Sequence, residues 1–108
     1  MTAAASSSAP AVLDTVGLLA DPLRRRIVAM LVDEELCTCH LVAETGAAQP
    51  TVSYHLKQLR EAGWVRADRV GRYTYYRLEA RALADVAASL GDLAERAREV
   101  DRRRLPCD

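Results

Sequence analysis

The sequence predicts a mainly α-helical domain of about five helices and one two-stranded β-hairpin. Three observations lead to this prediction. Apolar residues recur at helical spacing along most of the chain. Two short helical segments are joined by a tight turn that contains Gly46. A stretch rich in β-branched and aromatic residues follows them, at residues 64–78. A helix-turn-helix followed by a hairpin is a winged helix-turn-helix.

The first two helices are predicted from spacing and from a capping signal. Apolar residues between Val12 and Leu19 recur every three or four positions and give a short first helix. Asp21 and Pro22 then supply an N-cap and a proline at the first helical position of the second helix. Its apolar face consists of Leu23, Ile27, Met30 and Leu31. The run Arg24 to Arg26 is expected on the solvated face, with contacts to phosphate as the alternative.

The next two helices form the helix-turn-helix. The first covers the short segment from Cys37 to Glu44 and ends at Thr45-Gly46. The second begins at Gln49-Pro50, another helix-start signal, and ends at Gly63. Its buried stripe is expected to contain Val52, Leu56 and Leu59.

The hairpin and a long helix complete the prediction. Residues 64–70 and 73–78 form the two strands, and the tyrosines of the second strand alternate, with Tyr73 and Tyr75 on one face and Tyr76 on the other. A last helix runs from Ala80 to about Val100. Its apolar stripe is wide and serves either as core or, as we favour, as a homodimer seam shared with the first helix. The stripe consists of Leu83, Val86, Ala87, Leu90, Leu93, Ala94 and Ala97.

Length and composition indicate one domain, since the chain has 108 residues and half of them are apolar. We expect the domain at residues 11–101, between flexible tails at 1–10 and 102–108. No apolar run reaches the roughly 18 residues of a membrane span, and the N-terminus lacks the features of a secretory signal. We therefore expect a cytoplasmic protein with reduced thiols and no membrane partner. Three cysteines, an odd number, also argue against a disulfide framework.

The net charge is zero, but the charges are segregated. The chain has 15 basic and 15 acidic residues, yet residues 49–77 contain six basic and two acidic ones, and all five aromatic residues. This surplus of four positive charges is the kind of local basic region that nucleic acids attract. A dimer would carry a surplus of about eight, so we expect a shallow dependence of DNA affinity on salt.

The same segment carries side chains suited to reading DNA. A recognition helix places its N-terminal residues at base edges in the major groove. Polar side chains outside the buried stripe can bind bases or phosphates, and arginines on both sides of Gly71 suit the minor groove or the backbone. Ordinary exposure to solvent is the alternative for each residue. The predicted DNA contacts are Gln49, Thr51, Ser53, Tyr54, His55, Lys57, Arg69 and Arg72.

Cys37 and Cys39 form a Cys-x-Cys pair at the start of the helix-turn-helix. Residues two apart on an α-helix point about 200° apart, so two helical thiols cannot converge. In an extended or unwound segment they share one side and can bind one soft ion. Ion binding would then distort this helix start and move the recognition helix. Ordinary packing of two small apolar side chains is the alternative.

Three stretches resemble the ArsR/SmtB family of metal-responsive repressors: LADPLRRRI at 19–27, QPTVSYHLKQLREAG at 49–63 and GRYTYYRL at 71–78. The resemblance runs from about Val12 to Leu90 in the family's order. It implies a homodimer that binds an inverted-repeat operator in double-stranded DNA. Binding of a metal or metalloid would release the DNA and derepress resistance genes. It implies neither an enzyme nor an organic cofactor.

ELCTCHL at residues 35–41 resembles ELCVCDL of the arsenic-responsive subgroup, which implies an As(III) or Sb(III) site at Cys37 and Cys39. Two departures matter. Val42 stands where the subgroup often has a third cysteine, and His40 replaces the usual acidic residue. Because a trivalent metalloid prefers three thiolates, Cys107 of either subunit or a small external thiol would complete the site. His40 as a ligand would instead favour zinc or cadmium.

Other functions stay open at this point. The same fold could sense cadmium, lead, zinc or thiol oxidation, and a thiol metallochaperone or a winged helix for protein contacts are more remote. An enzyme would need a positioned base and a pocket, which the sequence does not offer. The family's second metal site combines Asp, His and Glu on the last helices. It is not expected here, because the last helix has no histidine beside Asp85, Asp92, Glu95 and Glu99.

Overall fold

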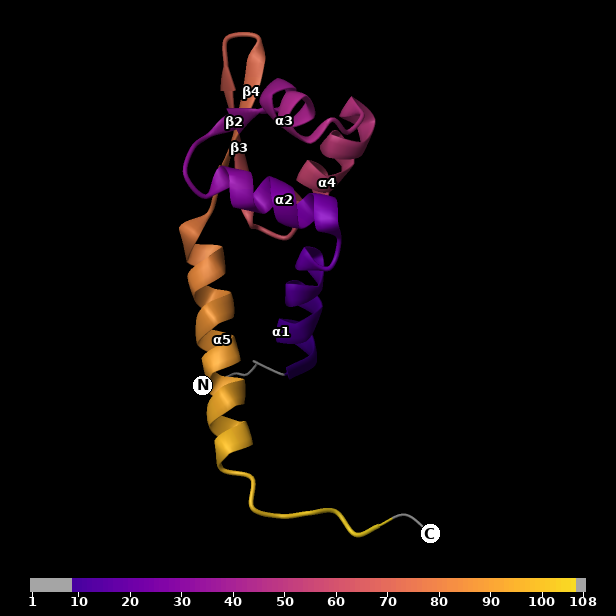
Figure 1. Cartoon of the computed structure of the whole chain (residues 1–108). Coiled ribbons are helices and arrows are strands. Elements are labelled where there is room, and N and C mark those ends of the chain that lie inside the picture. Colours follow the sequence, from indigo (N-terminus) through magenta and orange to yellow (C-terminus); the bar gives the residue numbers. More distant parts are fainter. Residues whose placement is uncertain (1–8, 107–108) are drawn as a thin grey trace.

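The computed structural model describes residues 9–106, in which helices and a small sheet form a body and one long helix leaves it (Figure 1). The predicted mainly helical winged helix is confirmed, with five α-helices. The elements are α1 (Ala9–Val16), the 3-10 helix η1 (Gly17–Leu19), α2 (Pro22–Leu31), β2 (Leu36–Cys37), α3 (Thr38–Thr45), α4 (Gln49–Glu61), β3 (Val65–Val70), β4 (Tyr73–Leu78) and α5 (Ala80–Arg98).

Local chemistry explains where the helices begin and turn. The Asp21 carboxylate accepts the Arg24 backbone N–H at 3.0 Å, and Pro22 takes the first position of α2, as the sequence predicted. This hydrogen bond is the main reason that the pKa of Asp21 lies below its ordinary value. Between α3 and α4, Gly46 has a φ of 73°, a left-handed conformation that glycine adopts without a Cβ clash.

The sheet has one strand more than the sequence predicted. Strands β3 and β4 form the predicted hairpin, in which Val70 pairs with Tyr73 next to the turn. The short strand β2 pairs antiparallel with the other edge of β4 and gives the order β2-β4-β3. The hairpin projects from the body as a wing (Figure 1).

One hydrophobic core holds these elements together. The predicted stripe of α4 is buried, with Val52, Leu56 and Leu59 each no more than 1% exposed. It packs with Ile27 and Leu31 of α2, Leu41 of α3 and Trp64. The tyrosine alternation agrees with this arrangement, because Tyr76 packs against the core while Tyr73 is half exposed.

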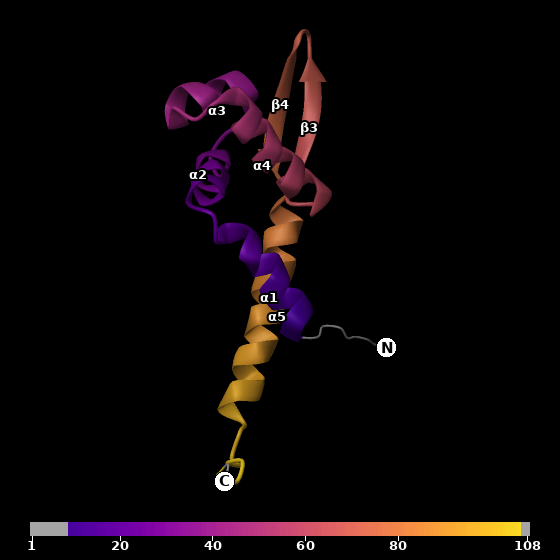
Figure 2. The same cartoon turned by 90° about the vertical axis from the view of Figure 1, so that its right-hand side faces the viewer.

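Helix α5 leaves the body after its first turns. Helix α1 packs along it (Figures 1 and 2), and Leu83 and Val86 reach the edge of the core. No residue of α5 is buried in the single chain, and Leu90 is 40% exposed. Much of the predicted stripe is therefore uncovered. No helix in residues 9–106 is long and apolar enough to cross a membrane.

The ends of the chain differ slightly from the prediction. Helix α1 begins at Ala9, inside the expected N-terminal tail, and continues into η1. Helix α5 ends at Arg98, and residues 99–106 have no regular structure. Residues 1–8, the rest of the predicted N-terminal tail, and Cys107, the predicted additional metal ligand, lie outside the described residues, so both predictions remain untested.

Candidate functional site

Helix α4 lies in the same half of the molecule as the wing (Figures 1 and 2), and its exposed positions are mostly polar. Burial of the apolar stripe turns the remaining positions of the helix outward. Tyr54, for example, is 56% exposed. Five of the six predicted DNA contacts on this helix are exposed: Gln49, Thr51, Ser53, Tyr54 and Lys57.

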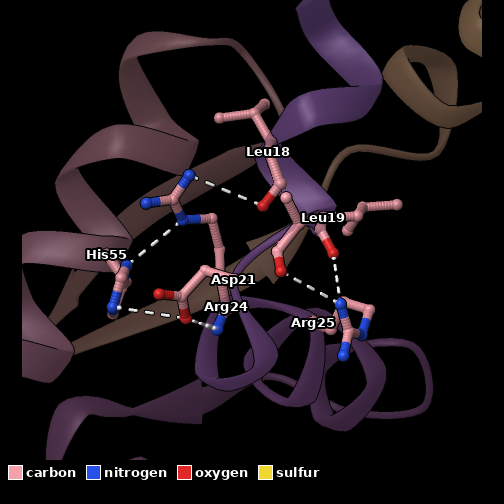
Figure 3. Close-up of polar contacts among 7 residues, drawn as sticks. Leu18, Leu19, Asp21, Arg24, Arg25 and His55 are labelled. Atoms are coloured by element: carbon pink, nitrogen blue, oxygen red, sulfur yellow. Dashed lines mark hydrogen bonds and ion pairs between the residues drawn. The ribbon is translucent and has the colours of Figure 1, made fainter.

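His55 is placed differently from the prediction. The residue is only 6% exposed and its side chain points into the domain, so it cannot reach a base edge (Figure 3). Its Nδ1 accepts a hydrogen bond from Arg24 Nε at 3.1 Å, and its Nε2 lies 3.7 Å from Asp21 Oδ1. The sequence contained the signal, because His55 is three residues after Val52 and four before Leu59 and so shares their face.

The three arginines of α2 donate hydrogen bonds to neighbouring elements, and Arg25 and Arg26 remain exposed, as expected for a solvated face. Arg25 Nη1 donates to the backbone oxygens of Leu19 and Ala20, at 2.8 and 3.2 Å. Arg26 Nη2 donates to Glu44 O at 2.8 Å. With Arg24, which contacts α4, these side chains connect α2 to η1, α3 and α4.

The wing offers two exposed arginines beside its turn. Arg69 Nε donates to Gly71 O at 3.3 Å, which holds this side chain against the tip. Arg72 is exposed, and within residues 9–106 no carboxylate lies within ion-pair distance of it. Both predicted wing contacts are thus accessible to a partner at the same end as the exposed face of α4.

Half of the cations in residues 49–77 are already paired. Three of them lie 3.9 Å from a carboxylate oxygen, in the pairs Lys57–Glu61, Arg66–Glu79 and Arg77–Glu35. The other three, Arg60, Arg69 and Arg72, have no carboxylate partner among the residues that the structure describes. The charge available to a polyanion is therefore smaller than the sequence count suggests.

Cys37 and Cys39 converge at the junction between a strand and a helix. Cys37 ends β2 and has the extended conformation of an N-cap (φ −86°, ψ 166°), whereas Cys39 is the second residue of α3. Because Cys37 lies outside the helix in an extended conformation, the two sulfurs can meet, as expected for an extended segment. Distortion of the helix start on ion binding stays a prediction. The two sulfurs are joined as a disulfide, which differs from the expected reduced thiols. Cys37 is 3% exposed, and Cys39 is exposed.

His40 completes this site. Its Nδ1 lies 3.1 Å from the Cys37 backbone nitrogen, whose N–H it accepts, and 3.3 Å from Cys37 Sγ. This is half of a capping box, a role for which an acidic residue at the same position is also suited. The ligand atoms of Cys37, Cys39 and His40 lie within 4.8 Å of one another. Two thiolates and an imidazole suit a soft or borderline ion once the disulfide is reduced.

The wing strand borders the thiol site directly. Cys37 pairs with Tyr75 across the β2–β4 ladder, and the rings of His40 and Tyr75 lie 6.0 Å apart. The sequence did not predict this contact, because a strand of two residues leaves no alternating pattern to detect.

Comparison with known proteins identifies the family. Residues 21–67 match the model described as bacterial regulatory protein, arsR family. A crystal structure of a possible transcriptional regulator for arsenical resistance is 32% identical, with a TM-score of 0.66, over 82% of this chain and 98% of that one. This chain belongs to the arsR family. The transcriptional repressor BigR from Xylella fastidiosa is 37% identical, with a TM-score of 0.64, over 74% of this chain and 83% of that one.

Curated members of the arsR family match over a shorter stretch. The arsenic resistance transcriptional regulator ArsR1 of Pseudomonas putida is 46% identical over 61 residues, which is 56% of this chain and 48% of that protein. The chain spans about half the length of the curated relatives it matches. These proteins are described as transcriptional regulators rather than enzymes, in agreement with the non-enzymatic function expected from the sequence.

Proposed function

We propose that this member of the arsR family is a transcriptional repressor that binds operator DNA with α4 and the wing. The observation that carries the proposal is the position of α4, which has exposed polar residues and lies in the same half of the molecule as the wing. The contacting residues are Gln49, Thr51, Ser53, Tyr54, Lys57, Arg69 and Arg72. Its DNA partner implies that it acts in the cytoplasm.

The proposed repressor acts as a homodimer on an inverted repeat. An apolar hollow of about 370 Å³ lies where α1, α5 and Trp64 meet. The stripe of α5 continues beyond it without cover from the same chain. Pairing of α1 and α5 with those of a second copy would bury both surfaces and present two copies of α4 to DNA.

The proposed inducer is As(III) or Sb(III), bound through Cys37 and Cys39. The convergence of the two sulfurs supports this assignment, and so does the similarity to regulators named for arsenic resistance. The disulfide must first be reduced, because thiolates are the ligands. His40 is one candidate for the third ligand, although its Nδ1 would have to give up the Cys37 backbone N–H. Cys107 of either subunit or an external thiol is the other.

The signal from the thiol site would reach DNA by two routes. Cys37 caps α3, which packs on α4, so a change at the cap alters the support of the recognition helix. Cys37 also pairs with Tyr75 in β4, so the same change alters the root of the wing. A shift of α4 or of the wing would break the proposed hydrogen bonds to DNA, because these depend on the exact position of each side chain.

A second candidate function is thiol-redox sensing at the same site, and the Cys37–Cys39 disulfide favours it. In this alternative, a peroxide oxidises the reduced pair, and the disulfide is the inducing form. Arsenite and peroxide would then act on the same two sulfurs and exclude each other.

The experiment is a DNA-release assay. Duplexes selected from a random pool by the reduced protein are labelled, and their fluorescence anisotropy is followed during titration with arsenite, antimonite, cadmium, zinc or hydrogen peroxide. We expect an inverted repeat to be selected and arsenite to release it. The variant Cys37→Ser/Cys39→Ser should bind the duplex and keep it in arsenite.

Three outcomes would contradict parts of the proposal. Release of the double-serine variant by arsenite excludes the thiol site as the sensor. Release of the wild type by peroxide but not by arsenite selects the redox alternative. Failure to select any duplex excludes DNA binding by the reduced protein and favours a protein partner. Binding of a duplex without salt dependence excludes the proposed phosphate contacts. Arsenic K-edge absorption of the wild type and Cys107→Ser counts the sulfur ligands, and an unchanged count excludes Cys107.

A further inference from the structure

A buried polar contact lies beneath the recognition helix. Within residues 11–106, His55 is the one polar or charged residue that is buried with the core. Its ring lies between Arg24 and Asp21, at the start of α2 (Figure 3). A polar side chain in a core is costly unless it is paired, so this position invites a functional explanation.

The hydrogen bonds fix the orientation of the His55 ring. Arg24 Nε can only donate, so Nδ1 of His55 must be the acceptor at 3.1 Å. In the neutral ring the proton is then on Nε2, which faces Asp21 Oδ1 at 3.7 Å. Asp21 is itself held by the Arg24 backbone N–H at 3.0 Å. The ring is thus oriented from both sides by groups of α2 and its cap.

Arg24 extends the contact to a third element. Its Nη1 donates to Leu18 O of η1 at 3.5 Å, while its Nε binds α4 (Figure 3). One guanidinium group therefore joins η1, which continues from α1, to the recognition helix. Arg25 anchors η1 as well, through Leu19 O and Ala20 O, but has no hydrogen bond to α4 among the described residues. A substitution of Arg25 thus affects only the anchoring of η1, whereas a substitution of Arg24 also affects the orientation of α4.

The rotation of α4 about its axis decides where its exposed face points. At the side-chain radius of a helix, about 5–6 Å, a rotation of about 10° moves the outward groups by about 1 Å. Hydrogen bonds tolerate only about 0.5 Å in length, so this rotation would break base contacts. Apolar packing alone is weakly directional, whereas the paired ring of His55 allows one orientation.

We propose that His55 and Arg24 are positioning residues for DNA recognition. They hold α4 at the rotation that its exposed residues require, and they connect this rotation to α1 and η1. The inference rests on the proposed DNA-binding function. Helix α1 is also part of the proposed dimer seam. Arg24 therefore couples the position of α1 and η1 to the orientation of the recognition helix.

The test compares specific and non-specific DNA binding of four single variants and one double variant by anisotropy, on a selected duplex and a scrambled one. His55→Leu and Arg24→Met remove the contact. His55→Asn retains an acceptor close to the place of Nδ1, and Arg25→Met is the matched control on the same helix. Circular dichroism at the assay temperature confirms that each variant is folded.

We expect His55→Leu and Arg24→Met to weaken binding to the selected duplex about 10- to 100-fold, the range for loss of one good base contact. Binding to the scrambled duplex should stay within about twofold, because it depends on phosphate charge. His55→Asn and Arg25→Met should keep most of the specificity. The double variant Arg24→Met/His55→Leu should be no worse than Arg24→Met alone, because Arg24→Met already removes the contact with His55.

Several results would overturn the inference. Unchanged specificity in folded His55→Leu and Arg24→Met shows that the contact serves stability alone. An equal loss in Arg25→Met shows that anchoring of η1 is what matters. Should His55→Leu fail to fold, Arg24→Met, which loses the hydrogen bond, is compared with His55→Asn, which retains an acceptor for it. A wild-type protein that selects no duplex overturns the proposed function instead, and this inference falls with it.

Discussion

Replacement of Arg72 by alanine should change the salt dependence of DNA binding by a predictable amount. Of the cations in residues 49–77, Arg60, Arg69 and Arg72 have no carboxylate partner in the described part of the chain. In the proposed dimer these three residues offer six cations to phosphates, whereas the charge of Lys57 is balanced by Glu61 even where its side chain contacts DNA. The slope of log K against log salt should therefore be about −5. Loss of Arg72 from both subunits should reduce its magnitude by about 2.

The assay is anisotropy of the selected duplex over a range of potassium chloride concentrations. Arg66→Ala is the matched control, because Arg66 is exposed in the same hairpin but lies 3.9 Å from Glu79. Its removal should leave the slope within about 0.5 of the wild-type value, since its charge is already balanced. A wild-type slope near −11, the value for twelve contacting cations, would refute the reasoning from charge pairs. Equal effects of the two substitutions would refute it as well.

Three further predictions concern stability and assembly. Leu56→Ala should lower the free energy of unfolding by about 2–5 kcal/mol in urea titrations, because Leu56 is 1% exposed, whereas Leu105→Ala should have no effect. Leu90→Glu/Leu93→Glu should yield monomers in analytical ultracentrifugation with the circular dichroism of the wild type; persistence of dimers would refute the seam. The pKa of Asp21 is lowered in the fold, so its stabilising effect is present at neutral pH and is lost as the pH falls through that lowered value. Thermal melts of wild type and Asp21→Asn should therefore differ at pH 7 and converge in acid, and a constant difference would contradict this.

Periodic features of the sequence predicted most of the fold. Val52, Leu56 and Leu59 recur at the spacing of one helix face, and all three are buried where expected. The Asp21-Pro22 pair predicted the start of α2 because a cap is a local interaction. The turn around Gly71 lay between two stretches of high β-propensity, and it joins the two strands of the wing. Local chemistry was sufficient for each of these elements.

Features that depend on distant partners were not predicted. Strand β2 exists because β4 offers a free edge to Leu36 and Cys37, and two residues carry no pattern of their own. His55 was assigned to DNA by its polarity, although its spacing placed it with the buried stripe. Its burial is tolerated because Arg24, 31 residues earlier, provides a hydrogen bond. The residue types at the DNA and thiol sites were therefore visible in the sequence, but their orientation was not.

The charge pairs and the thiol site together favour one way of releasing DNA. Release would follow from displacement of the contacting side chains rather than from a change in the charge of the protein. Lys57, Arg66 and Arg77 are balanced by carboxylates, so bulk attraction to DNA contributes less than the local surplus of positive charge suggests. In the proposed function, specific affinity then comes from contacts that tolerate little displacement, on α4 and at the tip of the wing. Cys37 lies where both elements are supported, through α3 and through its pairing with Tyr75. In the proposed function, a small change at Cys37 is thus sufficient to break the specific contacts, and the remaining charge attraction is too weak to keep the DNA bound.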